Sequence, residues 1–313
     1  MSSTFSERTV LVIGATGNHG RTGTAVVDQL IAHGRTVRVL TRSDDHRAAA
    51  LRQRGASTVI GDLHDRKTLP AAVDGVAAVY FTYPVAAGVI PAAANLASVL
   101  VELGLRPHLV VMSMAPSSHN SPSVLGQAQA LAEEILTWAG LNPTVLRVGA
   151  LFHENVLILH GQSIREHGVI TNSFGAARAP WIGGQDVAEL AVRHLLLPAP
   201  LAAAVTYPPG AEVLSHDEIA QIISAETGQN IEYRPVSHQQ WRAMIETQAD
   251  SGARSPVNHA MAQHISIIGA GFASGNAPAV QPDADTLSVT LGHQPSTFAE
   301  FVREHRSEFV DLR

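Results

Sequence analysis

The sequence contains no cysteine among its 313 residues, which excludes disulfides, catalytic thiolates and thiolate metal sites. It has no block of basic residues, and its formal net charge is −6, so its charge does not favour binding to nucleic acid. No apolar run approaches the roughly 20 residues that a membrane-spanning helix needs. Because the first seven residues are polar and lead directly into an expected strand, we expect no signal peptide, no membrane partner and a cytoplasmic location.

Histidine is abundant, with 16 residues, but the histidines are scattered along the chain. They form no H-x-x-x-H or H-E-x-x-H spacing, the patterns that place two imidazoles on one helical face for a metal. We therefore expect no metal centre, and nothing in the sequence indicates a flavin.

An apolar run at residues 10–13 leads straight into the glycine-rich stretch G-A-T-G-N-H-G at residues 14–20. The run is typical of a buried parallel strand, and a helix-compatible stretch follows it. Such a turn binds a dinucleotide pyrophosphate, because free N–H groups at the helix start face the phosphates and a Cβ would block their approach. A tight loop without a ligand is the alternative. The predicted cofactor-binding residues of this loop are Gly14, Thr16, Gly17, Asn18, His19 and Gly20.

Strand-like and helix-like segments alternate through the first half of the chain. Short turns between them imply right-handed crossovers, and hence a Rossmann-type doubly wound parallel sheet of the α/β class. The expected further strands cover residues 36–41, 57–62, 76–82, 108–113 and 143–148, and the expected helices cover residues 45–54, 66–74, 88–104 and 124–139.

Beyond residue 148 the pattern becomes irregular, which predicts a smaller α/β C-terminal portion that binds the substrate. We assign residues 1–150 to an NAD(P)-binding domain and 151–313 to the substrate portion, with some segments returning to the core. The stretch 251–283 is rich in Gly, Ala, Pro, Asn and Ser, which predicts a mobile loop or lid. Short strands are expected at 205–207 and 231–233, and helices at 184–197, 215–227 and 239–249.

The end of the second strand distinguishes NAD from NADP. Arg42 and Ser43 stand where a basic side chain and a hydroxyl would bind a 2′-phosphate, so we predict that NADP(H) is preferred over NAD(H). Because Asp44 and Asp45 follow at once, a solvated turn residue is the alternative for Arg42. Asp62, with Leu63, is predicted to line the adenine pocket, and its alternative is a helix cap.

Several segments occur in an order and spacing that resemble the NmrA-like branch of the atypical short-chain dehydrogenase/reductases. The resemblance covers nearly the whole chain and implies an NAD(P)H-dependent reductase of quinones, dyes or aromatic ethers, or a non-catalytic nucleotide sensor. The segments are G-A-T-G-N-H-G at 14–20, T-R at 41–42, V-Y-F-T-Y-P at 79–84, E-I-L at 134–136, A-G-L at 139–141, T-V-L-R at 144–147, F-H-E-N at 152–155, D-V-A at 186–188 and F-A-E-F-V at 298–302.

One departure from the wider superfamily concerns its catalytic pair. Typical members use a Tyr, and a Lys four residues later, to deliver a proton and hold the nicotinamide ribose. Aligned through residues 134–136, this chain has Gln129 and Glu133 at those places. Carbonyl reduction with a Tyr acid is therefore not expected, whereas the resemblance implies that this branch tolerates such replacements.

Quinone reduction makes weaker demands, because a conjugated ring accepts hydride without a strong acid once it is stacked and shielded from water. Side chains at the strand ends could line that site, although Tyr80, Phe81 and Met112 are expected in the core. Besides those named above, the predicted cofactor residues are Thr82, Tyr83, Pro84 and Ser113, and the predicted substrate residues are Tyr83, Met114, Phe152 and His153.

His119 and His153 follow expected strands and are the candidate catalytic proton donors. The leading hypothesis is an NAD(P)H-dependent oxidoreductase acting on a small, conjugated aromatic substrate, such as a quinone or a polyketide-type ring. Two alternatives stay open: an NAD(P)-sensing regulatory protein without turnover, and reduction coupled to O2 with net hydroxylation. A homodimer is compatible with the sequence.

Overall fold

The computed structural model describes residues 9–17, 20–200, 202–252, 255–277 and 281–310. A seven-stranded sheet lies at its centre, in the order β10-β6-β5-β4-β1-β2-β3, and every neighbouring pair runs parallel. The strands are β1 (Thr9–Ile13), β2 (Val37–Thr41), β3 (Ser57–Ile60), β4 (Val76–Phe81), β5 (His108–Met114), β6 (Thr144–Val148) and β10 (Ala204–Thr206).

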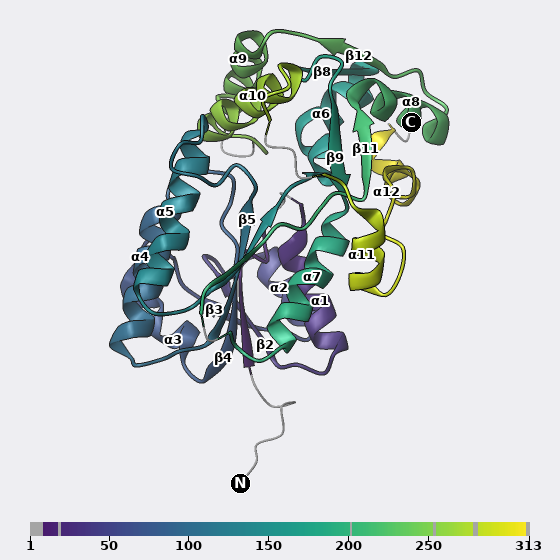
Figure 1. Ribbon diagram of the computed structural model, residues 1–313. Helices are drawn as coiled ribbons and strands as arrows, with labels where there is room; N and C mark the ends of the chain where they lie inside the picture. The colour runs from purple at the N-terminus through teal and green to yellow at the C-terminus, as the bar shows by residue number, and fades with distance from the viewer. Residues whose placement is uncertain (1–8, 18–19, 201, 253–254, 278–280, 311–313) are drawn as a thin grey trace.

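Helices cover both faces of this sheet, so the predicted doubly wound α/β fold is confirmed (Figure 1). The inner strands are apolar on both faces because both are buried against helices. On one face lie α1 (Thr22–Ala32), α2 (His46–Gln53) and α7 (Gly184–Leu196). On the other lie α3 (Pro70–Val73), α4 (Val89–Glu102) and α5 (Val124–Trp138), with the 3₁₀ turn η2 (Arg66–Thr68) before α3.

The C-terminal elements stand over the carboxyl ends of the central strands (Figure 1). Two small sheets form there, in the orders β11-β9-β7 and β12-β8. Their strands are β7 (Leu151–Phe152), β8 (Val169–Asn172), β9 (Arg178–Ile182), β11 (Glu212–Ser215) and β12 (Glu232–Pro235). The helices are α6 (Glu154–His167), α8 (His216–Thr227), α9 (His238–Ala249), α10 (His259–Ala273), α11 (Ala284–Leu291), α12 (Phe298–Glu304) and α13 (Arg306–Phe309).

Part of the C-terminal half returns to the central sheet. Strand β10 pairs with β6, and α7 packs against α1. At the other end of the chain, Arg21 donates two hydrogen bonds to the Glu308 carboxylate, at 2.7 and 3.1 Å. The glycine-rich turn is therefore enclosed by segments that are distant in sequence.

The expectation of a mobile loop or lid over 251–283 is wrong for its middle part, residues 259–273, which form a helix. Helix α10 occupies the middle of that stretch and packs against α9 and α5. It begins where the Asn258 side chain accepts a hydrogen bond of 3.0 Å from the Met261 N–H. Its buried Met261 and Ala262 join Trp241 in an apolar cluster. Tertiary packing thus stabilises a glycine- and alanine-rich segment that has little polar contrast of its own.

No helix within the described part of the chain has both the length and the apolar character that crossing a membrane would require.

Candidate active site

A cavity of about 840 Å³ lies at the carboxyl ends of the central strands. It extends from the turn after β1, past the ends of β2, β4 and β5, to the loop after β6 and to α10. Parallel α/β sheets bind ligands at this edge, where successive loops diverge. The position agrees with the one expected from the strand–helix alternation.

The glycines of the first turn serve different purposes. Gly14 has a φ of 86°, and a Cβ there would lie 2.5 Å from the Thr82 Cγ2. A Cβ on Gly23 would lie 2.5 Å from the Gly14 carbonyl oxygen, so α1 packs tightly on the turn. A Cβ on Gly17 would meet only that same oxygen, at 3.2 Å. Gly14 and Gly23 are therefore needed for close packing within the fold, whereas the absence of a side chain at Gly17 leaves space in the cavity.

Gly14, Thr16 and Gly17 line the cavity, together with Gly23, which was not predicted although it continues the three-residue glycine spacing. Gly20 is buried outside the cavity lining, and a Cβ on it would lie 3.2 Å from the Phe152 ring. Asn18 and His19 lie outside the described residues. Helix α1 begins without a side-chain cap, so backbone N–H groups of its first turn are available to an anion.

Two arginines line the cavity after β2, Arg42 next to the strand end and Arg47 in the first turn of α2. Arg47 is paired with Asp45, whose carboxylate accepts from its guanidinium at 2.8 Å and caps α2. The hydrogen bonds from Arg47 hold the pKa of Asp45 well below its usual range. Ser43 is absent from the cavity lining, and its hydroxyl donates to Asp45 at 3.1 Å. Arg42, by contrast, lines the cavity.

Asp62 and Leu63 line the cavity after β3, and Asp62 also accepts a hydrogen bond of 2.9 Å from the His64 N–H. Asp62 thus stabilises the turn after β3, and its contact with an adenine stays a prediction. Thr82, Tyr83 and Pro84 line the neighbouring wall. The Tyr83 hydroxyl lies 2.7 Å from His64 Nε2, and burial is the main cause that raises its pKa.

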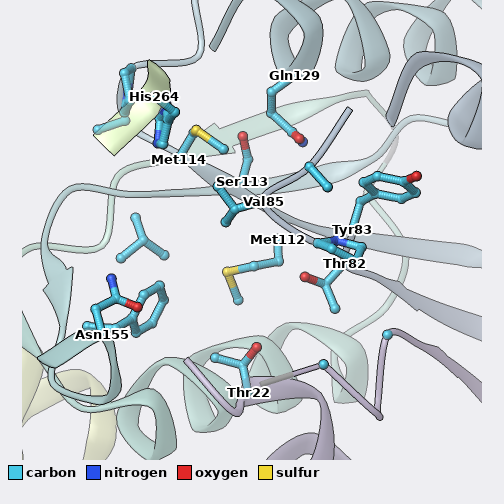
Figure 2. Close-up of a pocket in the computed structure, with 18 of the residues that line it drawn as sticks. Thr22, Thr82, Tyr83, Val85, Met112, Ser113, Met114, Gln129, Asn155 and His264 are labelled. Carbon is cyan, nitrogen blue, oxygen red and sulfur yellow. The ribbon is translucent and has the colours of Figure 1, made fainter. Parts of the chain in front are cut away.

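Gln129 and Glu133 lie one turn apart on α5 but have different surroundings. Gln129 is 6% exposed and lines the cavity, with its amide directed inward (Figure 2). Glu133 is 4% exposed and is absent from the cavity lining. Its carboxylate accepts from Arg147 at 2.6 and 3.0 Å, from Ser117 at 2.8 Å and from Ser113.

This network fixes the roles that its members can take. Arg147 also donates to the Tyr207 hydroxyl at 2.9 Å, so it joins the end of β6 to the segment after β10. Ser113 lines the cavity, but its hydroxyl proton is directed to Glu133, which leaves its oxygen as an acceptor for ligands. The carboxylate at the place of the superfamily's lysine therefore has a structural partner of opposite charge.

Neither predicted catalytic histidine lies in the cavity lining. His119 is exposed, and its Nε2 lies 2.7 Å from a Glu134 carboxylate oxygen. His153 is fully buried, because its ring packs against Phe298 and Phe301 at centroid distances of 5.5 and 5.6 Å. These positions do not support a catalytic role for either residue, or the predicted substrate contact of His153.

Some of the aromatic and methionine side chains singled out from the sequence are buried in the core, and others line the cavity. Tyr80 and Phe81 are fully buried, and the Tyr80 hydroxyl donates to Thr22 at 3.1 Å within the fold. Burial raises the Tyr80 pKa well above its usual range. The predicted substrate residues Met114 and Phe152 line the cavity, as does Met112, which was expected in the core.

Several lining residues were not singled out from the sequence because α6 and α10 bring them to the cavity from distant parts of the chain. They are Asn155, His264, Ile267, Ile268, Gly271 and Phe272.

The imidazole of His264 lies where α10 meets the start of α5. Its Nδ1 is 2.6 Å from the hydroxyl oxygen of Ser123, the residue that caps α5. The ring retains some surface toward the cavity, while the surrounding protein lowers its pKa to about 4 by desolvation.

A second cavity of about 70 Å³ adjoins the first behind His264 and Asn155, which line both. His160 and His216 line this smaller space beside Trp241. Burial lowers the pKa of His160 to about 4 and also lowers that of His216, so both imidazoles are neutral near pH 7. Among the described residues, no group of three or more His, Asp or Glu side chains is arranged to hold a metal ion.

The residues present fit a nicotinamide dinucleotide. Gly17 leaves space beside the start of α1 for a pyrophosphate, and Arg42 stands at the end of β2, where the adenosine ribose of such a cofactor lies. The remaining cavity, toward Met114 and His264, leaves room for a second molecule.

Comparison with known proteins gives a consistent assignment. A sequence profile described as the NmrA-like family matches residues 6–302. An NAD(P)H azoreductase of Xenophilus azovorans is 29% identical over 303 residues, covering 96% of this chain and 99% of that protein. An uncharacterized oxidoreductase of Bacillus subtilis (strain 168) is 28% identical over 302 residues, covering 95% and 96%.

Solved structures share the fold. An NADPH-dependent quinone oxidoreductase from Escherichia coli, complexed with NADPH, has a TM-score of 0.77 at 22% identity, covering 95% of this chain and 99% of that one. The triphenylmethane reductase of Citrobacter sp., complexed with NADP(H), has a TM-score of 0.73 at 19% identity, covering 94% and 99%.

Proposed function

The chain belongs to the NmrA-like family, and from this premise we propose that it is an NAD(P)H-dependent reductase of conjugated, electron-poor aromatic acceptors such as quinones. The observation that carries the proposal is the large cavity that continues from the glycine turn to α10. One ligand fits beside Gly17 and Arg42, and a second fits beside Met114 and His264. The names of the azoreductase and quinone oxidoreductase relatives support the same class of reaction.

The proposed roles follow from chemistry at the walls. A bound nicotinamide dinucleotide supplies a hydride. The turn around Gly17 holds its pyrophosphate through backbone N–H groups, while Phe152 and Met112 offer apolar surface to rings. Pro84 and Ile268 help to exclude water from the space where the two ligands would meet. No Tyr–Lys pair is needed, because charge delivered to a quinone spreads over a conjugated ring.

We further propose that NADP(H) is preferred over NAD(H). Of the two arginines after β2 that line the cavity, Arg47 is neutralised by Asp45, whereas Arg42 offers its charge to a 2′-phosphate. Arg42→Ala should weaken NADPH binding about tenfold and leave NADH binding nearly unchanged, as one charge-assisted contact implies. Fluorescence titration with both nucleotides measures this difference, with Arg35→Ala as a control outside the cavity lining. Equal losses for both nucleotides would remove Arg42 from the selection.

The experiment that tests the proposed activity follows NADPH and NADH oxidation with 1,4-benzoquinone, a naphthoquinone and an azo dye. We expect turnover with at least one acceptor in the absence of O2. Turnover that requires O2 would instead favour the oxygenation outcome. Tight nucleotide binding without turnover toward any acceptor would overturn the reductase proposal and favour a nucleotide sensor.

A further inference from the structure

We propose that Gln129 and His264 form an uncharged pair that holds the reducible atom of the substrate and stabilises the anion formed by hydride addition. This inference rests on the proposed reductase function and concerns the substrate half of the same cavity. Neither residue belongs to a Tyr–Lys pair, and they come from helices α5 and α10.

The side chain of Gln129 is the first observation. It is 94% buried and lines the cavity, and among the described residues no hydrogen bond to its amide is found. Glu133, one turn later, has its carboxylate fully engaged by two serines and Arg147. A buried amide without a protein partner is unfavourable unless water or a ligand completes its hydrogen bonds. The Gln129 amide is therefore available to a molecule in the cavity.

The hydrogen bonds around His264 supply the second observation. The Ser123 hydroxyl oxygen accepts from the Gly126 N–H at 3.2 Å and lies 2.6 Å from His264 Nδ1. The inferred pair requires that the serine hydroxyl donate its proton to Nδ1, which leaves the proton of a neutral imidazole on Nε2. That tautomer makes His264 a hydrogen-bond donor at the cavity wall, held in place by the cap of α5.

The close-up supports a shared target for the two residues. Gln129 and His264 lie along one side of the cavity, with Ser113 and Met114 between them in this view and Thr22 on the opposite side (Figure 2). Ser113 can only accept hydrogen bonds, because its proton goes to Glu133. Gln129 and His264 can therefore both offer N–H donors to a substrate in this region.

The chemistry of quinone reduction needs donors of this kind. Hydride transfer would break a C–H bond of the dihydronicotinamide and form a bond between that hydrogen and the quinone. The electron pair moves with the hydrogen, which would leave a negative charge on a quinone oxygen. A proton from water then completes the hydroquinone. Neutral N–H groups stabilise such an oxyanion without giving up a proton, and they do so most strongly in a site that excludes water. A buried imidazole with a lowered pKa meets this requirement near pH 7.

Among the residues that the structure describes, no acidic side chain faces His264 to favour its protonated form, and burial is the cause that lowers its pKa. Ser123 faces it from the start of α5, Asn155 and Leu151 share its cavity wall, and neutral His160 and His216 line the small cavity behind it. The imidazole should therefore stay uncharged through the neutral range, and the rate should not follow a histidine titration near pH 6.5.

The test uses Gln129→Leu, Gln129→Met, His264→Leu and His264→Gln in the full-length protein, with 1,4-benzoquinone as acceptor. Removal of either donor should lower kcat about 100- to 1,000-fold, as loss of one oxyanion donor does elsewhere, and leave the NADPH dissociation constant unchanged. His264→Gln keeps an N–H donor and should recover much of the lost rate. His259→Gln is the matched control, because His259 lies on the same helix and is exposed beside Asp250.

Each outcome decides the inference. A measurable wild-type rate that none of the folded variants lowers, as judged by thermal melting, would overturn the pair while leaving the reductase function intact. A His264→Gln rate as low as that of His264→Leu would also overturn it. So would a pH profile in which the wild-type rate falls with a pKa near 6.5 and the His264 variants lack that step. If the wild-type protein binds NADPH but reduces no acceptor, the proposed function fails first and the pair fails with it.

Discussion

The two walls of the cavity are built in different ways. The part of the cofactor wall that would hold the pyrophosphate consists of backbone from one continuous segment, in which β1 turns through Gly14 and Gly17 into α1. The substrate wall includes side chains from α5, α6 and α10, of which Gln129 and His264 are 135 positions apart in sequence. A wall of backbone depends on where side chains are absent, whereas a wall of side chains depends on how helices pack.

The two walls can therefore differ in chemistry independently of each other. The glycine turn offers backbone N–H groups, and these stay the same whatever side chains stand in the opposite wall. The opposite wall can exchange an amide, an imidazole or a methionine without disturbing the turn.

The largest expected effect comes from filling the open place in the cofactor wall. Gly17→Val should abolish measurable NADPH binding, a loss of at least about 100-fold, because the added side chain occupies the pyrophosphate space. The fold should survive, since a Cβ at Gly17 meets only the Gly14 oxygen at 3.2 Å. Calorimetric titration measures binding and thermal melting measures stability. Gly23→Val is the contrast, because its Cβ would approach the same oxygen to 2.5 Å and should impair folding itself.

The next effect concerns the charge network behind the substrate wall. Glu133→Gln should lower the free energy of unfolding by about 3 kcal/mol, because it leaves the largely buried Arg147 guanidinium without its carboxylate. Urea denaturation at pH 7 measures the change. Glu134→Gln, in the next position, removes only an exposed contact with His119 and should cost less than about 0.5 kcal/mol. Similar losses in both variants would contradict a structural role for the network.

The smallest effect lies at the seam between the two walls, where the buried Glu154 accepts hydrogen bonds from the Gly184 N–H at 3.1 and 3.2 Å. Burial raises the pKa of Glu154 from 4.5 to about 7. Its neutral form therefore contributes stability that is complete below about pH 4.5 and is lost as the pH rises through 7. Glu154→Gln should remove this loss, so its stability relative to wild type should improve by about 2 kcal/mol between about pH 5 and pH 8.

Urea midpoints of both proteins at several pH values test this expectation. A stability difference between Glu154→Gln and wild type that is independent of pH would mean that the carboxyl is already ionised at pH 5.

Sequence reasoning located the glycine turn at the edge of the cavity because its signal is local. A buried strand, glycines at fixed spacing and a helix start are adjacent in the chain, so the role of Gly17 could be proposed without knowing any tertiary contact. The replacement of the superfamily's Tyr and Lys by Gln129 and Glu133 could also be recognised from the sequence, since both lie on one predicted helix.

What the sequence did not reveal depends on packing between distant elements. His264 lies in a glycine- and alanine-rich stretch whose helix is stabilised by contact with α9 and α5, so composition alone indicated a loop. His153 is the opposite case, a residue that the sequence predicted in the site and that the structure buries outside the cavity lining. It follows a strand, as many functional residues do, but the aromatic rings of Phe298 and Phe301 enclose it.

The return of α7 and β10 to the central sheet has a consequence for protein engineering. A cut at residue 150 would remove the helix that covers α1 and the strand that covers the edge of β6. Exchanging substrate specificity between two members of the family therefore requires transplanting two separate segments, roughly 150–183 and 207–310, around a retained α7 and β10. Chimeras joined at a single point would expose apolar surface on both faces of the junction and lose the cooperative unfolding of the parent proteins.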